Sequence, residues 1–253
     1  MSQKLEQLAR DEAFMARALA LAERGTGWTS PNPLVGAVIV KDGRIIGEGW
    51  HTACGQPHAE REALAACDED PAGSTLYVTL EPCCHWGKTP PCTDAILEAG
   101  IARVVVGALD PNPLVAGQGC AQLREAGTVV ETGVLEEGCR HLNEVFFHFI
   151  TTGRPLVVLK YAMTLDGKAA TRTGASRWIT GPEARERVHR DRHRFAAIMV
   201  GIGTALADDP ALTCRLEGGP WRQPLRIVVD SQGRLPLDAL LVRTAQEIPT
   251  LVA

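Results

Sequence analysis

TLYVTLEPCCHWGKTPPCTDAIL, residues 75–97, sets the architecture of the first half of this 253-residue chain. Residues 75–80 combine β-branched and aromatic side chains, which predicts a strand. That strand delivers Glu81-Pro82-Cys83 at its carboxyl end. In Pro90-Pro91-Cys92 two prolines precede the cysteine, a pattern that favours the start of a helix. The stretch therefore predicts a strand and a helix that each present a cysteine at one end.

A histidine and a carboxylate lie upstream in His58-Ala59-Glu60. Gly55-Gln56-Pro57 interrupts the chain, and residues 58–67 (HAEREALAAC) then predict a helix. Side chains two apart on a helix diverge by roughly 200°, so His58 and Glu60 meet only at the first turn, off the helix end. We therefore expect two helix N-termini to converge on one metal, with the dipole of the second helix lowering the pKa of the Cys92 thiol.

His58, Cys83 and Cys92 form the donor set of an open zinc site. One imidazole and two thiolates leave the fourth position of a tetrahedral Zn²⁺ vacant. Two thiolates cancel the formal charge of the metal, so its water is acidified less than in a three-histidine site. A proton carrier is then needed, and Glu60 is predicted to be the catalytic acid and base. The combination is the signature of zinc-dependent base deaminases.

Two alternatives stay open for the cysteines. Free cysteine is among the most often buried residue types, and five cysteines without metal-ligand spacing are expected to be buried thiols: Cys54, Cys67, Cys120, Cys139 and Cys214. A zinc-stabilised binding module without turnover would need a fourth protein ligand, for which Cys84 and His85 are the candidates.

Composition narrows the class of protein. No apolar run is long enough to span a membrane, and the polar, helical N-terminus is unlike a signal peptide. Eight cysteines without a small secreted domain indicate a reducing, cytoplasmic compartment. The net charge of −4 argues against nucleic-acid binding. We expect a cytoplasmic homo-oligomer that binds neither nucleic acid nor membrane.

The charge is divided unevenly along the chain. Residues 1–150 carry 11 Lys and Arg against 20 Asp and Glu, whereas residues 151–253 carry 15 against 10. The basic second part suits anionic small ligands such as a phosphorylated substrate or a dinucleotide. The alternative is a solvated helix face, because five arginines crowd one segment: Arg185, Arg187, Arg190, Arg192 and Arg194.

Alternating strands and helices predict an α/β protein with two domains, residues 1–150 and 151–253, and a linker at 151–155. The site is expected where strand carboxyl ends and helix N-termini meet. The expected helices are 11–24, 58–67, one from residue 92, 119–126, 135–150 and 182–194. The expected strands are 35–40, 44–50, 75–80, 103–107, 128–131, a buried run at 155–163, 196–200, 225–229 and one beginning at 248.

Three motifs of the first half resemble the RibD-type deaminase–reductases of riboflavin biosynthesis. They are PNPLVG at residues 31–36, HAE at 58–60 and TLEPCCHWGKTPPC at 79–92. Eight residues separate Cys83 from Cys92, whereas cytidine and tRNA-adenosine deaminases separate these cysteines by two. The second half agrees through residues 159–168, 176–180 and 203–213. The resemblance covers nearly the whole chain and implies a three-layer cytidine-deaminase-like domain followed by a dihydrofolate-reductase-like domain.

The resemblance implies two reactions on one phosphorylated pyrimidine. The first domain would use one Zn²⁺ to remove the 2-amino group of 2,5-diamino-6-ribosylamino-4(3H)-pyrimidinone 5′-phosphate, and the second would use NADPH to reduce the ribosyl to a ribityl chain. In the first domain, substrate-binding roles are implied for Asn32, His51, His85, Lys88 and Thr89. Their alternative roles are a turn asparagine, surface histidines and a solvated lysine.

The second domain contains no G-x-G-x-x-G, so its cofactor site follows from the resemblance alone. NADPH-contacting positions match Ala162, Trp178, Thr204, Asp208 and Ser231. Substrate-contacting positions match Ser176, Arg192, Leu212 and Arg215. Members of the family continue through a further glycine-rich segment, so the resemblance also implies that the reductase domain is partial here. A nucleoside or tRNA-base deaminase is the rival enzyme class.

Overall fold

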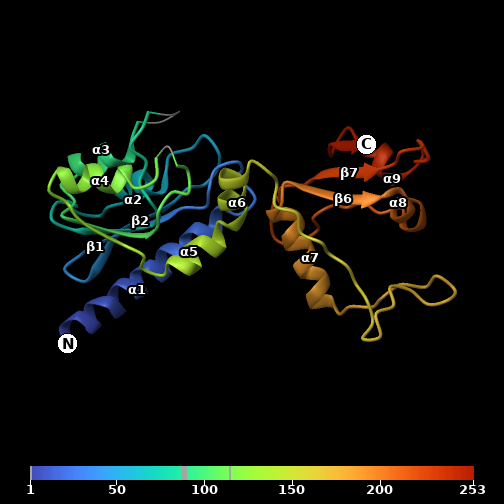
Figure 1. Cartoon of the computed structure of the whole chain (residues 1–253), viewed down its shortest axis with the longest axis horizontal. Coiled ribbons are helices and arrows are strands. Elements are labelled where there is room, and N and C mark those ends of the chain that lie inside the picture. Colours follow the sequence, from blue (N-terminus) through green and yellow to red (C-terminus); the bar gives the residue numbers. More distant parts are fainter. Residues whose placement is uncertain (1, 87–89, 114) are drawn as a thin grey trace. The chain divides into compact units, whose positions relative to one another are not determined.

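The computed structural model of the chain describes residues 2–86, 90–113 and 115–253 (Figure 1). The chain forms two compact units, Met1–Leu156 and Val157–Ala253. The domain boundary expected at residue 150 lies inside a helix, α6, which spans Glu144–Thr152. Each unit is described by itself.

Unit 1 is built on one mixed five-stranded sheet in the order β2-β1-β3-β4-β5. β1 pairs antiparallel with β2 and β3, whereas β3, β4 and β5 run parallel. Asp42 and Gly43 both have positive φ in the turn between the first two strands, which confirms the expected hairpin. The strands are β1 Gly36–Lys41, β2 Arg44–Trp50, β3 Thr75–Leu80, β4 Arg103–Ala108 and β5 Val129–Thr132.

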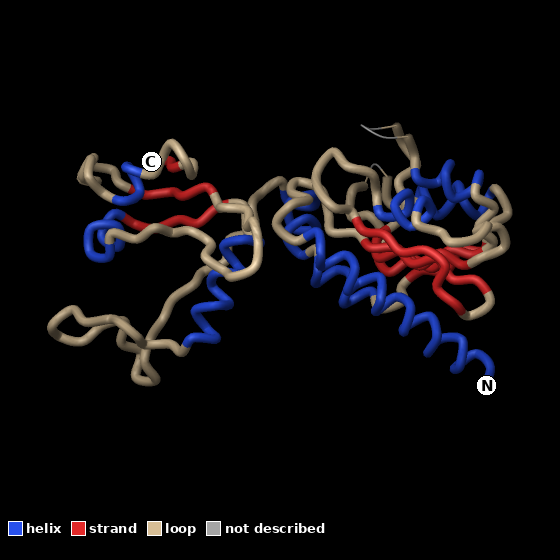
Figure 2. The backbone as a smooth tube through the Cα atoms, turned by 180° about the vertical axis from the view of Figure 1, so that it is seen from behind, coloured by secondary structure: helices blue, strands red, loops and turns tan. Residues whose placement is uncertain are grey.

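Helices cover both faces of this sheet (Figure 2). On one face α2, α3 and α4 pack against Ile39, Val78 and Val104. On the other face α1, α5 and α6 pack against the alternate residues, such as Val38 and Val105. This period-2 division gives the three-layer α/β architecture that was expected. The helices are α1 Ser2–Ala22 with the short 3-10 turn Glu23–Gly25, α2 Ala59–Ala65, α3 Cys92–Glu98, α4 Gln118–Glu125, α5 Glu136–Leu142 and α6.

Two glycines of β2 let α2 lie directly against the sheet. A Cβ at Gly47 would stand 2.4 Å from the Ala63 carbonyl oxygen, and a Cβ at Gly49 would stand 2.3 Å from the Ala63 nitrogen. Both distances are far below van der Waals contact, so only glycine fits at these positions. The depth at which α2 packs therefore depends on these glycines.

The single helix expected at residues 135–150 is wrong. The structure has two helices, α5 and α6, that meet at Asn143. The Asn143 side chain is buried and makes two hydrogen bonds to the backbone of Leu34: the Leu34 N–H donates to Asn143 Oδ1 (2.7 Å), and Asn143 Nδ2 donates to the Leu34 oxygen (2.8 Å). Apolar periodicity continues through this point, so the sequence pattern did not show the break.

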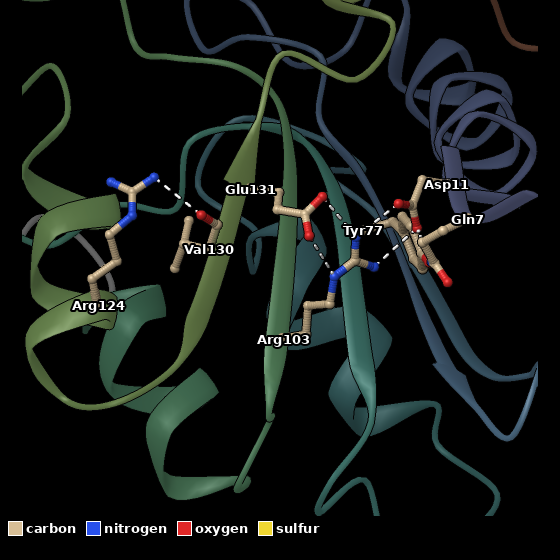
Figure 3. A network of polar contacts seen from close by, with 7 residues as sticks. All are labelled: Gln7, Asp11, Tyr77, Arg103, Arg124, Val130 and Glu131. Carbon is tan, nitrogen blue, oxygen red and sulfur yellow. Dashed lines mark hydrogen bonds and ion pairs between the residues drawn. The ribbon is translucent and has the colours of Figure 1, made fainter. Parts of the chain in front are cut away.

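A buried acid ties α1 to the sheet (Figure 3). Asp11 accepts two hydrogen bonds from the Arg103 guanidinium (2.9 and 2.7 Å) and one from the Tyr77 hydroxyl (2.7 Å). Burial alone would raise the pKa of Asp11, but the hydrogen bonds from Arg103, Tyr77 and Gln7 outweigh burial and lower the pKa. The folded unit therefore stabilises the charged form of Asp11.

We expect Asp11→Asn to lower the free energy of unfolding of unit 1 by about 2 kcal/mol, the range of charge-assisted hydrogen bonds. Because the folded pKa is lowered, the stabilisation is complete above about pH 3.9 and is lost as pH falls through the folded value. Denaturant titration between pH 7 and pH 2 should show the gap to wild type closing with acid.

The matched control is Glu48→Gln, which removes the exposed Arg17–Glu48 ion pair (2.6 Å). This variant should lose less than about 1 kcal/mol. An Asp11→Asn variant no less stable than Glu48→Gln would contradict the prediction.

Unit 2 holds a smaller parallel sheet in the order β6-β7-β8. Its core joins Val228 of the central strand to Ile202, Ala205 and Leu241. The helix expected at 182–194 and the strands expected at 196–200, 225–229 and from 248 are confirmed. The elements are α7 Pro182–Arg194, β6 Ala197–Gly201, α8 Ile202–Asp208, β7 Leu225–Val229, α9 Leu240–Arg243 and β8 Thr250–Val252.

The buried strand expected at residues 155–163 is wrong. This segment has no regular secondary structure, and the side chains of Val157 and Leu159 are each 82% exposed. The run is apolar enough for a buried strand, but in the described residues it pairs with none of β6, β7 and β8. An apolar run forms a buried strand only where a neighbouring strand pairs with it.

Candidate metal centre

Three side chains capable of binding a metal meet in unit 1. The ligand atoms of His58, Cys83 and Cys92 all lie within 4.8 Å of one another. His58 Nδ1 is 3.5 Å from Cys83 Sγ and 3.3 Å from Cys92 Sγ. No other group of this kind occurs in the described part of the chain. The spacing suits one cation held by one imidazole nitrogen and two sulfurs.

Each donor stands at the end of a secondary structure element. His58 is the N-cap of α2 and Cys92 is the first residue of α3. Cys83 lies three residues beyond β3, and its sulfur accepts the Cys92 backbone N–H (3.3 Å). The two helix N-termini therefore converge as expected. Their positive ends face the sulfurs and favour negative charge there.

One expectation about the thiols is wrong. The pKa of Cys92 is raised and not lowered, first by its hydrogen bond to Cys83 and then by burial. The same hydrogen bond, with a further one from His58, lowers the pKa of Cys83 to about 4. Without a cation, the two sulfurs share a proton through this hydrogen bond. A bound divalent cation would take the place of that proton, so the donor chemistry fits zinc.

Glu60 lies in the first turn of α2, and its side chain is buried. Burial, followed by the charge of Cys83, raises the pKa of Glu60 to about 7, and a hydrogen bond with Cys92 opposes this. Glu60 is not one of the three clustered donors. Its carboxyl group lies beside the donors, since it hydrogen-bonds with Cys92.

Two of the residues implied to bind substrate lie beside the donors. The His51 ring meets the His58 ring edge to face, with centroids 5.6 Å apart. Asn32 Nδ2 is 3.1 Å from His51 Nε2. His51 is buried, whereas Asn32 is half-buried. Burial, and then the charge of His58, lowers the pKa of His51.

The loop after Cys83 is described only in part. His85 is exposed and lines a small cavity with Cys83, Cys84 and Asp110. Lys88 and Thr89, the implied phosphate-binding residues, lie outside the described residues. Neither Cys84 nor His85 joins the donor cluster within the described residues, so the closed binding module finds no support there.

The five cysteines that were expected to be buried thiols differ in their burial. Cys120, Cys139 and Cys214 are buried, as expected. Cys54 is exposed, so its expected burial is wrong, because it stands in the loop that follows β2 and not on a core face. Cys67 is partly buried, and its thiol donates to the Ala63 oxygen (3.4 Å).

Sequence reasoning missed Glu81. Its buried carboxylate accepts the backbone N–H groups of Asp110 (3.1 Å), Gly117 (2.9 Å) and Cys120 (3.1 Å). These bonds fix the connection between β4 and α4 to the strand end that carries Cys83. The acid next to Pro82-Cys83 was visible in the sequence. Its partners, 29 to 39 residues away, were not.

Unit 2 brings three of its implied substrate residues together. Arg192 Nη1 donates to the Thr213 oxygen (2.9 Å), and Arg215 Nη1 donates to Thr213 Oγ1 (2.8 Å). Leu212 is the buried neighbour of Thr213. Burial, and then the charge of Arg215, lowers the pKa of Arg192. Two guanidinium groups around one residue form a site that suits an anion.

The implied NADPH positions fall on several segments. Thr204 lies in the first turn of α8, directly after β6, and Ser231 follows β7. Both therefore stand near the carboxyl ends of parallel strands, the edge where such sheets bind ligands. Asp208 is the last residue of α8. Trp178 is exposed, with the Arg185 guanidinium 4.3 Å from its ring centroid. Ala162 and Ser176 lie in irregular chain. Within the described residues, no hydrogen bond joins Ala162 or Ser176 to the other residues implied to bind NADPH or substrate.

Zinc content should separate the adjacent cysteines. We expect Cys83→Ser to lose most of its zinc, because serine does not provide the thiolate that the site uses. Cys84→Ser should hold as much zinc as wild type, which makes it the matched control. Metal analysis of both purified variants checks this, and equal losses would contradict the three-donor site.

Two family models match the chain. Residues 8–108 match the cytidine and deoxycytidylate deaminase zinc-binding region, and residues 155–253 match the RibD C-terminal domain. The first match contains the three donors and Glu60. In the described part of the chain, no helix has the length and apolar character needed to cross a bilayer.

Full-length relatives agree with both family models. The riboflavin biosynthesis protein RibD of Actinobacillus pleuropneumoniae is 57% identical over 243 residues, which cover 96% of this chain and 64% of that protein. RibD of Aquifex aeolicus is 52% identical and covers 96% of this chain and 67% of the relative. The chain thus spans about two thirds of the length of these relatives.

A solved structure from Thermotoga maritima resembles the chain closely. It is described as a diaminohydroxyphosphoribosylaminopyrimidine deaminase/5-amino-6-(5-phosphoribosylamino)uracil reductase and is 48% identical, with a TM-score of 0.90. The match covers 97% of this chain and 70% of that one.

Proposed function

Since this chain belongs to the RibD family of riboflavin biosynthesis proteins, we propose that unit 1 is a zinc-dependent deaminase and unit 2 an NADPH-dependent reductase. The first substrate is 2,5-diamino-6-ribosylamino-4(3H)-pyrimidinone 5′-phosphate. Unit 1 exchanges its 2-amino group for oxygen and releases ammonia. Unit 2 then reduces the ribosyl chain to ribityl.

The convergence of His58 Nδ1, Cys83 Sγ and Cys92 Sγ beside a buried Glu60 carries the proposal for unit 1. These three residues would hold the zinc. When bound, zinc would supply a water that is more acidic than bulk water. The Glu60 carboxyl group would take up that proton and deliver it to the ring nitrogen, and would then carry the second proton of the water from the added hydroxyl group to the leaving amine. The ring carbon that carried the 2-amino group thereby becomes a carbonyl with the oxygen of the water, and the amino group leaves as ammonia.

The two arginines around Thr213 support the proposal for unit 2. Arg192 and Arg215 would hold the substrate phosphate, with Ser176 and Leu212 beside it. Thr204 and Ser231, near the strand ends, would contact the dinucleotide together with Asp208, Ala162 and Trp178. The reduction consumes one hydride from NADPH and one proton.

The proposal places the enzyme in the cytoplasm as a homo-oligomer that acts on a small phosphorylated pyrimidine. In unit 1, Asn32, His51, His85, Lys88 and Thr89 are proposed for the substrate side of the site. Nucleic acids and membranes are not partners in this proposal.

Product analysis tests both steps. The zinc-loaded chain is incubated with the diaminopyrimidine phosphate, with and without NADPH, and the products are identified by mass. We expect ammonia and the deaminated product without NADPH, and the ribityl product only with it. Cytidine and adenosine serve as rival substrates. Ammonia from cytidine but not from the pyrimidine phosphate would favour the nucleoside deaminase.

A further inference from the structure

Residues 213–215 of unit 2 have no regular secondary structure, yet side chains from other segments hold their backbone. The Cys214 N–H donates to Gln223 Oε1 (2.7 Å), and Gln223 Nε2 donates to the Cys214 oxygen (3.1 Å). The Arg215 N–H donates to His189 Nδ1 (3.1 Å). These hydrogen bonds fix the path of the chain at the point from which the Arg215 side chain extends.

One face of α7 holds the loop of residues 215–222 at both ends. His189 and His193 are four positions apart, so their side chains lie on the same face of the helix. His193 Nδ1 accepts the Arg222 N–H (3.1 Å), just as His189 Nδ1 accepts the Arg215 N–H. A protonated imidazole nitrogen does not accept a hydrogen bond, so both rings are bare at Nδ1.

The two arginines around Thr213 carry like charges with no acid between them. In the described part of unit 2, no carboxylate forms an ion pair with Arg192 or Arg215. Arg215 is exposed, so a loosened backbone would let its long side chain turn away from Arg192 and relieve the repulsion. Burial, and then the charges of both arginines, lowers the pKa of His189, which keeps this ring neutral and able to accept.

We propose that His189 and Gln223 are positioning residues for Arg215, which keep its guanidinium beside that of Arg192 as one site for a phosphate group. The inference rests on the substrate site proposed for unit 2. A phosphate group accepts charge-assisted hydrogen bonds from both guanidinium groups at once, so its affinity depends on how they are placed. Loss of a positioning residue leaves both arginines in the chain but no longer preorganised.

Binding of D-ribose 5-phosphate tests the inference, because this probe carries a sugar phosphate without the pyrimidine. The full zinc-loaded chain is titrated calorimetrically in a Lys88→Ala reference form, which lacks the lysine proposed to bind phosphate in unit 1. We expect His189→Leu and Gln223→Leu each to raise Kd by about 5- to 10-fold, the usual effect of one or two lost hydrogen bonds. His189→Asn keeps an acceptor near the place of Nδ1 and should stay within about twofold of the reference form.

Arg190→Gln is the matched control. Arg190 is the neighbour of His189 on α7, but it is exposed and pairs with Glu186 of the same helix (2.6 Å). The variant removes a positive charge near the site without touching residues 213–215, and its Kd should stay within about twofold of the reference form. A control that weakened binding as much as His189→Leu would mean that affinity follows net charge, and the proposal would be overturned.

The decisive comparison repeats both leucine substitutions in an Arg215→Ala background. If they act through Arg215, they should there cost less than about twofold, because the coupling has already been removed. Losses that multiply fully in this background would overturn the proposal.

A second measurement does not need a ligand. NMR of ¹⁵N-labelled chain should show a scalar coupling between the Arg215 amide nitrogen and His189 Nδ1, which are connected only by the hydrogen bond. Absence of this coupling, or a His189 protonated at Nδ1, would also overturn the proposal.

The titration separates this inference from the proposed function. A reference form that bound no ribose 5-phosphate would contradict the substrate site proposed for unit 2, whereas binding that neither leucine variant weakens would overturn only the positioning roles. Gln223→Glu, which keeps the acceptor for the Cys214 N–H, replaces Gln223→Leu if the latter does not fold.

Discussion

Glu60→Gln is expected to lower the rate of deamination by about 10³-fold, within the range usual for a positioned acid and base. Glutamine has nearly the same volume as glutamate and fits the buried position, but it neither accepts nor delivers a proton. Since Glu60 is outside the donor cluster, the variant should bind as much zinc as wild type. Ammonia release and metal analysis on the same preparation measure both quantities.

The control for this variant lies on the same helix. Glu62 is the next acid in the first turn of α2, and Glu62→Gln changes the charge near the site by the same amount. We expect this control to keep its rate within about twofold, because Glu62 is only half-buried and water screens its charge. If Glu60→Gln lost its metal, Glu60 would be a ligand and its proposed role would be wrong.

Gly49→Ala is expected to have the largest structural effect. Its Cβ would stand 2.3 Å from the Ala63 nitrogen and 2.5 Å from the Ala59 oxygen, both backbone atoms of α2. The helix must move away from β2, and overpacking of this kind costs about 3 kcal/mol. His58 and Glu60 move with the helix. We expect the Tm of unit 1 to fall by about 10 °C and zinc affinity to fall with it.

A glycine in α5 provides the matched control. A Cβ at Gly138 meets only the tip of Leu19, at 3.3 Å, and alanine is the better helix former. Gly138→Ala should therefore leave Tm within about 2 °C of wild type and zinc binding unchanged. Calorimetry and zinc titration distinguish the two variants, and a Gly49→Ala variant that behaves like the control would contradict the role assigned to this contact.

The sequence predicted those parts of the site that depend on local pattern. His58, Glu60 and Cys92 stand beside chain breaks and prolines that start helices, and Cys83 follows a strand rich in β-branched residues. Such signals act over a few residues and are visible in one sequence. For the same reason the order of elements in unit 1 could be predicted almost completely.

The rest depends on contacts between distant residues. Asn143 interrupts a continuous apolar pattern, and its side-chain amide hydrogen-bonds to Leu34, 109 residues away in the chain. The pKa values of the two thiols depend on the hydrogen bond between their sulfurs, which joins residues nine apart in the chain. Residues 155–163 have the composition of a buried strand, but composition does not show whether a neighbouring strand receives it.

The three hydrogen bonds to Glu81 come from main-chain amides and not from side chains. Substitutions at positions 110 and 120 therefore leave the donors in place, unless proline removes them. Gly117 is different, because its φ of +78° is strained for any other residue. Side chains at positions 110 and 120 can therefore diverge during evolution while the path of the chain beside the cysteine persists. Selection at this point should act on Glu81 and on the path of the chain segment that it binds.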